Sequence, residues 1–113
     1  MSGMKILCVE DHPEDLAVLT YMLESIGYEV MSASSEGQAI ALFTQQAIDG
    51  VLLEYNLPDA SGATVRAKLK AIRPDVPVML FAGIDSDTPF MLRFFDAYLR
   101  NEEGFENLGD SNI

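Results

Sequence analysis

The sequence is poor in the residues that build disulfides, zinc sites and membrane spans. Its one cysteine, Cys8, cannot form an internal disulfide, and the apolar residues around it indicate a buried thiol. Its one histidine, His12, leaves no cysteine and histidine cluster for structural zinc. No apolar run reaches the length of a transmembrane helix, and the run that begins at Lys5 is too short for the core of a signal peptide. We therefore expect neither a membrane span nor a signal peptide.

Positive charge is also scarce. The chain has 7 basic and 18 acidic residues, which gives a formal net charge of −11. Phosphates would repel such a chain, so unaided binding to nucleic acid or to an anionic membrane surface is excluded. We interpret the acidity as a source of solubility together with a locally acidic site.

The pattern of apolar residues predicts strands alternating with helices. Hydrophobic residues make up 49% of the 113 residues and charged residues 22%, as in a single globular domain. Short apolar runs alternate with segments in which apolar residues recur at helical spacing. The predicted strands are Lys5–Val9, Tyr28–Ser32, Val51–Glu54, Pro77–Ala82 and Asp96–Leu99.

Capping and turn residues mark the helix ends. We expect Asp11 to cap the first helix and Gly27 to end it. Ser34 or Ser35 caps the second helix, and the third opens at Ser61 or Gly62. Between the fourth and fifth predicted strands a short helix, Met91–Phe95, is expected.

This alternation predicts an α/β fold with right-handed crossovers. The length fits a flavodoxin-like doubly wound fold, with a five-stranded parallel sheet in strand order 2-1-3-4-5 and a shortened C-terminal part. Ligands of such sheets bind beyond the carboxyl ends of the strands, at the switch between the first and third. Glu10, Asp11 and Glu54 lie at those ends, so the sequence predicts an acidic site there.

Five stretches of the chain, in the same order and at similar spacing, resemble the receiver domain of bacterial response regulators. They are Ile6–Pro13, Gly27–Val30, Leu52–Gly62, Arg73–Val78 and Asp96–Leu99. The resemblance covers residues 4–101 and leaves 102–113 as a C-terminal tail or a truncated last helix.

The resemblance implies a site for Mg²⁺. Glu10 and Asp11 take the places of the acidic pair that holds the ion in this family, and Asn56 takes the place of the residue that offers its backbone carbonyl. Mg²⁺ prefers oxygen ligands and keeps several waters, so this set suffices. The residues leave open whether the ion is bound, because carboxylates at this point can also cap a helix.

Several positions depart from the family pattern. Glu54 stands where the family has the aspartate that accepts the phosphoryl group, and its extra methylene carries the carboxylate farther into the pocket. Ala82 and Asn101 replace the hydroxyl and the lysine that contact the phosphoryl group. Tyr98 matches an aromatic switch position on the fifth strand. A carboxylate at position 54 can imitate the modified state weakly or reflect a loss of function, and the sequence leaves both open.

The resemblance implies a signal transduction module of the cytoplasm rather than an enzyme. We expect it to act by contact with a protein, such as a histidine kinase, a phosphotransfer protein or another regulator, and not to be phosphorylated at the usual site. One alternative is an active receiver that accepts a phosphoryl group from a histidine kinase. A second is a small metal-dependent flavodoxin-like enzyme, for which the sequence offers no set of base, nucleophile and substrate pocket.

A shortened C-terminal part also predicts exposed apolar surface. A doubly wound sheet without a full final helix leaves one face partly uncovered, and such surface is usually hidden by another chain. We therefore expect a homodimer or a partner complex. The aromatic residues that it would cover are Phe90, Phe94, Phe95, Tyr98 and Phe105.

Overall fold

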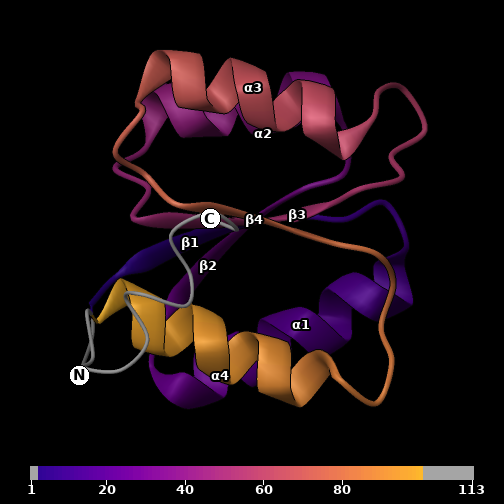
Figure 1. The fold of residues 1–113 in the computed structure, drawn as a ribbon, viewed down its shortest axis with the longest axis vertical. Coiled ribbons are helices and arrows are strands. Elements are labelled where there is room, and N and C mark those ends of the chain that lie inside the picture. Colours follow the sequence, from indigo (N-terminus) through magenta and orange to yellow (C-terminus); the bar gives the residue numbers. More distant parts are fainter. Residues whose placement is uncertain (1–2, 101–113) are drawn as a thin grey trace.

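A computed structural model of the protein describes residues 3–100, in which one parallel sheet lies between two layers of helices (Figure 1). The strands are β1 (Lys5–Val9), β2 (Glu29–Ala33), β3 (Gly50–Glu54) and β4 (Val78–Phe81), in the order β2-β1-β3-β4. The helices are α1 (Pro13–Ile26), α2 (Glu36–Gln45), α3 (Gly62–Ile72) and α4 (Thr88–Leu99). In this part of the chain, no helix is long and apolar enough to cross a membrane. The predicted flavodoxin-like fold class is confirmed.

The two central strands are apolar because helices cover both of their faces. Leu7 and Val51 belong to a buried cluster with α2 and α3, whereas Cys8 and Leu52 belong to a second cluster with α1 and α4. All of these side chains are fully buried. Parallel strands buried on both faces need continuous apolar runs, which is why the strand prediction was accurate here.

Most predicted helix ends are confirmed. Ser35 and Ser61 cap α2 and α3, each accepting a hydrogen bond from a backbone N–H three residues later. Gly27 ends α1 in the left-handed conformation, with a φ of 108°. The exception is Asp11, because α1 begins one residue later, after His12, whose side chain makes no capping bond.

The predicted fifth strand is wrong. Asp96–Leu99 forms the last turn of α4, because Leu92 and Phe95 continue a helical spacing of buried residues through this segment. A right-handed crossover from β4 to a neighbouring fifth strand would place its helix on the α2 and α3 side. Instead α4 lies beside α1, on the opposite face (Figure 1). Within residues 3–100, the sheet therefore ends at β4.

Because this segment is a helix and not a strand, two further predictions need correction. Tyr98 lies on a helix and packs into the α1 and α4 cluster, so it is not a switch residue on a strand. Phe95 is fully buried within its own chain and needs no second copy to cover it. Among the predicted contact aromatics, Phe90 is 68% exposed, and Phe105 lies outside the described residues.

Candidate functional site

The carboxyl ends of β1, β3 and β4 surround a small cavity. Its lining brings together three residues that the sequence predicted for the site, namely Glu54, Asn56 and Ala82. The remaining lining residues are His12, Asp15 and Gly83. Asn101, another predicted position, lies outside the described residues.

Glu54 is buried and is held by two backbone amides. One carboxylate oxygen, Oε2, accepts a hydrogen bond from the Asn56 N–H at 3.0 Å. The other, Oε1, accepts from the Gly83 N–H, also at 3.0 Å. The side chain is only 4% exposed. Two converging backbone N–H groups form a cradle for an anion, and here the carboxylate of Glu54 occupies it.

The loop after β3 is fixed in place by close backbone packing. The Gly62 N–H donates to the carbonyl of Tyr55 at 2.6 Å, and Asn56 forms an isolated antiparallel bridge with Ser61. A Cβ atom at Gly62 would lie 2.7 Å from the carbonyl oxygen of Glu54. Glycine is therefore required at this position for the loop to pack against the end of β3.

Glu10, at the end of β1, has a different environment. Its Oε2 accepts hydrogen bonds from the His12 backbone N–H at 2.9 Å and from the His12 Nδ1 at 3.1 Å. The side chain is fully buried, and its second oxygen, Oε1, has no hydrogen-bond partner. The carboxylate of Glu10 is thus satisfied on one side only.

Electrostatics at this end of the sheet oppose the accumulation of negative charge. Burial raises the pKa of Glu10, and the charges of Glu54 and Asp15 raise it further, whereas the hydrogen bonds from His12 oppose the shift. The pKa of His12 is raised, mainly by its bond to Glu10 and then by Asp11. Burial also raises the pKa of the Cys8 thiol, to about 12. A cation at this point would relieve the repulsion among the carboxylates.

The donor set fits a hard divalent cation. Besides Glu10 Oε1, the Oδ1 of Asp11 is buried without a hydrogen bond, although it lies 3.6 Å from His12 Nδ1. Ligand atoms of Glu10, His12 and Asp15 lie within 4.8 Å of one another. Buried carboxylate oxygens without partners are the ligands that Mg²⁺ prefers.

Sequence reasoning missed three members of the lining, His12, Asp15 and Gly83. Gly83 supplies one of the two donors to Glu54, and its φ of 74° lies in the left-handed region that glycine tolerates. A glycine directly after a predicted strand end was the available signal. Asp15 reaches the cavity from the first turn of α1, and an acidic residue in the first turn of the helix that follows the acidic pair was the corresponding signal. For His12, the signal was its place directly after that acidic pair.

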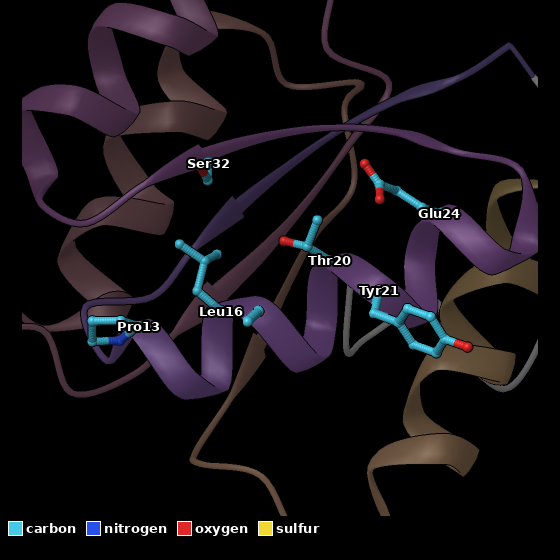
Figure 2. A pocket seen from close by; sticks show the side chains of 7 residues that line it. Pro13, Leu16, Thr20, Tyr21, Glu24 and Ser32 are labelled. Carbon is cyan, nitrogen blue, oxygen red and sulfur yellow. The ribbon is translucent and has the colours of Figure 1, made fainter.

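A second hollow lies between α1 and the edge strand β2, away from the strand ends. In Figure 2 the side chains of Leu16 and Thr20 on α1 point toward Ser32 of β2. Glu24 is the only charged residue in its lining, which otherwise consists of apolar and hydroxyl side chains. Among the described residues, no hydrogen bond joins the carboxylate of Glu24 to the hydroxyl of Thr20, Tyr21 or Ser32, so the lining holds no paired nucleophile and base.

Comparisons with known proteins agree with the fold. The sequence profile of the response regulator receiver domain matches residues 6–106. Protein PilH of Pseudomonas aeruginosa is 34% identical over 86 residues, which cover 74% of this chain and 71% of PilH. Several other curated relatives are much longer, and the chain spans only 6% to 37% of their length.

Two solved structures are informative about the family. The receiver domain of sensor histidine kinase PA1611 from Pseudomonas aeruginosa, with a magnesium ion coordinated in its active site cleft, has a TM-score of 0.68 at 28% identity, covering 78% of this chain and 75% of that one. The complex of histidine kinase ThkA with response regulator protein TrrA has a TM-score of 0.68 at 27% identity, covering 73% and 71%. Since the profile spans most of the sequence, this chain belongs to the response regulator receiver domain family.

Proposed function

We propose that this receiver domain works in phosphorelay signalling by protein contact and is not phosphorylated at Glu54. The observation that carries the proposal is the occupied amide cradle. Both oxygens of Glu54 already accept hydrogen bonds, from the N–H groups of Asn56 and Gly83. A phosphoryl group on this side chain would need donors of the same kind for its own oxygens, and it would have to displace the carboxylate from them.

The residue at the end of β4 supports the same conclusion. Ala82 lines the cavity beside Glu54 but has no hydroxyl to donate to a phosphoryl oxygen. The buried carboxylate instead occupies the cradle itself. We infer that Glu54 gives the domain one fixed state, which imitates the charge of the modified state in part.

Mg²⁺ is the cation that fits the acidic cluster, and we propose that Glu10 and Asp11 hold it, with Asn56 offering its carbonyl. The ion would supply positive charge that offsets the repulsion among the buried carboxylates. The oxygens without partners on Glu10 and Asp11 support this assignment.

We propose that the chain acts in the cytoplasm and that its partner is a histidine kinase, a phosphotransfer protein or another regulator. The alternative of an active receiver would use Glu54 itself as the acceptor. A catalytic function is not supported, because within the described residues no hydrogen bond pairs a hydroxyl or thiol with a base in the cavity at the strand ends or in the hollow beside α1.

Intact mass spectrometry after incubation with acetyl phosphate and Mg²⁺ tests the proposal. The wild type should gain no phosphoryl group. In Glu54→Asp, the shorter carboxylate can attack phosphorus, so that an oxygen–phosphorus bond forms, the bond to the acetate oxygen breaks and acetate leaves. We expect weak modification of this variant, increased by adding Ala82→Thr and Asn101→Lys.

Glu54→Gln is the matched control, because it keeps the size of the side chain without a nucleophilic oxygen. Modification of the wild type that disappears in Glu54→Gln would identify Glu54 as an acceptor and establish the active receiver instead.

A further inference from the structure

The outer edge of β4 carries backbone groups that a neighbouring strand could bind. Hydrogen bonds from the Val51 N–H to the Pro77 carbonyl (2.9 Å) and from the Tyr55 N–H to the Phe81 carbonyl (2.8 Å) show which β4 residues face β3. Backbone groups alternate along a strand, so those of Val78 and Leu80 face outward.

This edge is only partly blocked. The Val78 carbonyl accepts a hydrogen bond from Nε of Arg66 on α3 at 3.0 Å. Within residues 3–100, no hydrogen bond links the outward N–H or carbonyl of Leu80 to another residue. An edge with open N–H and carbonyl groups is a template for an added strand.

An apolar groove follows the same edge. It lies between β4 and α4, and its apolar lining residues are Met79, Leu80, Phe90, Met91 and Phe94. Phe90 is 68% exposed, although large aromatic side chains usually bury most of their surface. The groove exists because α4 lies on the α1 side of the sheet and the described chain places no fifth strand beside β4. Side chains of an added strand could therefore pack against α4 while its backbone pairs with β4.

The charges near this edge indicate which kind of strand could bind there. Asp87 lines the groove, and Asp85 lines the adjoining hollow at the carboxyl end of β4. The positive charge of Arg66 lies at the other end of β4, where its Nε is bonded to the Val78 carbonyl. Asp87 makes no side-chain capping bond, and both aspartates are exposed. A strand with basic residues would meet these carboxylates favourably.

The same charges disfavour two other occupants. A second copy would bring another formal charge of −11 to an acidic edge. The chain's own residues 101–113 include Glu102, Glu103, Glu106 and Asp110 but no lysine or arginine.

We propose that the outer edge of β4 and the groove beside it bind an extended segment of a partner protein, rich in apolar and basic residues, as a fifth strand. This names a surface for the protein contact proposed above, and it does not depend on the phosphorylation state of Glu54. A failure of either proposal is therefore distinguishable from a failure of the other.

Synthetic peptides that alternate valine with lysine, and matched peptides that alternate valine with glutamate, provide the probe. Binding to the full chain is measured by amide chemical shifts and by hydrogen exchange. We expect the lysine peptide to slow exchange at the Leu80 amide and the glutamate peptide to bind more weakly. Methylating alternate peptide nitrogens, which removes the donors that pair with β4, should abolish binding.

Variants of exposed residues test the surface without threatening the core. Phe90→Ala, which removes apolar contact without changing the charge, should weaken binding of the lysine peptide about tenfold or more. Reversing charge with Asp85→Lys and Asp87→Lys should shift preference toward the glutamate peptide. Tyr21→Ala on α1, which removes a side chain that is 74% exposed, is the control and should leave binding unchanged.

Three results would overturn the proposal. Equal binding of the two peptides would remove the charge argument. A Leu80 amide already protected in the monomeric chain would show that the chain covers its own edge. Protection that appears only with concentration-dependent dimerisation would assign the edge to a second copy.

Discussion

The carboxylates at the ends of β1 and β3 are both buried, but their oxygens have different partners. The two carboxylate oxygens of Glu54 accept hydrogen bonds from two backbone amides, one on the loop after β3 and one on the loop after β4. One carboxylate oxygen of Glu10 accepts hydrogen bonds from His12, and the other has no hydrogen bond. The backbone amides near the end of β3 therefore form an anion site, which the carboxylate of Glu54 occupies. The end of β1 instead offers a buried carboxylate oxygen without a partner, which suits a cation.

The difference indicates which half of the site has changed. A receiver needs a cation next to a position where a phosphoryl group can form. The carboxylates proposed to hold the cation are present, and the carboxylate of Glu54 occupies the two backbone amides that we propose a phosphoryl group would need. Stability measurements should therefore distinguish the two strand ends, because loss of Glu54 removes needed acceptors and neutralisation of Glu10 removes an unfavourable buried charge.

Gly62→Ala should give the largest effect, because the added Cβ would lie 2.7 Å from both the Glu54 carbonyl oxygen and the Tyr55 Cα. Neither backbone atom can move away easily, so we expect a loss of about 3 kcal/mol in the free energy of unfolding by urea denaturation. Gly37→Ala on α2 is the control, since nothing lies within 4 Å of its added Cβ. It should stabilise the protein by up to about 1 kcal/mol. Equal effects of the two changes would mean that the loop after β3 is not held closely.

Glu54→Ala should destabilise the protein by about 2 kcal/mol, because the N–H groups of Asn56 and Gly83 both lose their acceptor. Glu54→Gln keeps one acceptor oxygen and should lose about half as much. Urea unfolding at neutral pH measures both changes. If the two variants were as stable as the wild type, water would satisfy these amides equally well and the cradle would have no structural role.

Glu10→Gln should act in the opposite direction and raise the melting temperature at neutral pH by a few degrees. Because the pKa of Glu10 is raised above its ordinary value of 4.5, the folded state binds the proton more tightly than the unfolded state. The wild type therefore loses stability as pH rises through the raised pKa, and the advantage of Glu10→Gln should shrink as pH falls below 4.5. Glu14→Gln, an exposed neighbour, should change little. A lower melting temperature for Glu10→Gln at neutral pH would contradict the assignment of the two strand ends.

Mg²⁺, which we propose binds at Glu10 and Asp11 with the Asn56 carbonyl, should give the smallest effect. At a concentration equal to its dissociation constant, a ligand of the folded state stabilises by about 0.4 kcal/mol. Thermal melts in increasing Mg²⁺ should show this rise in the wild type and a much smaller one in Asp11→Asn. Melts that do not respond to Mg²⁺ would show that His12, with its raised pKa, already supplies the positive charge.

The sequence predicted the first four strands well and the last segment poorly, for a physical reason. Strands β1 and β3 are buried on both faces, so their apolar runs have few alternatives. Asp96–Leu99 is short and fits a strand locally, but it continues the helical spacing of Leu92 and Phe95. Which face of the sheet a helix covers depends on the whole connection from β4, and no local pattern contains that information.

The candidate site, like the fold, could be predicted only in part. Side-chain ligands such as Glu10, Asp11 and Glu54 are visible as residue types at strand ends. Backbone donors are not, because every residue except proline has an N–H and only the fold decides where it points. The Gly83 amide belongs to the loop after β4 and reaches Glu54 across the cavity, so the filled cradle could not be inferred before the structure was known.

Amide chemical shifts in the presence of beryllofluoride and Mg²⁺ test the central claim most directly, because beryllofluoride imitates a phosphoryl group on a carboxylate. If Glu54 fills the cradle, the amide resonances of Asn56 and Gly83 in the wild type should respond no more to beryllofluoride with Mg²⁺ than to Mg²⁺ alone. In Glu54→Asp the shorter side chain withdraws from these donors, and both resonances should move further when beryllofluoride is added. A saturable response of both amides to beryllofluoride in the wild type would show that the cradle accepts a phosphoryl group, and it would contradict the account.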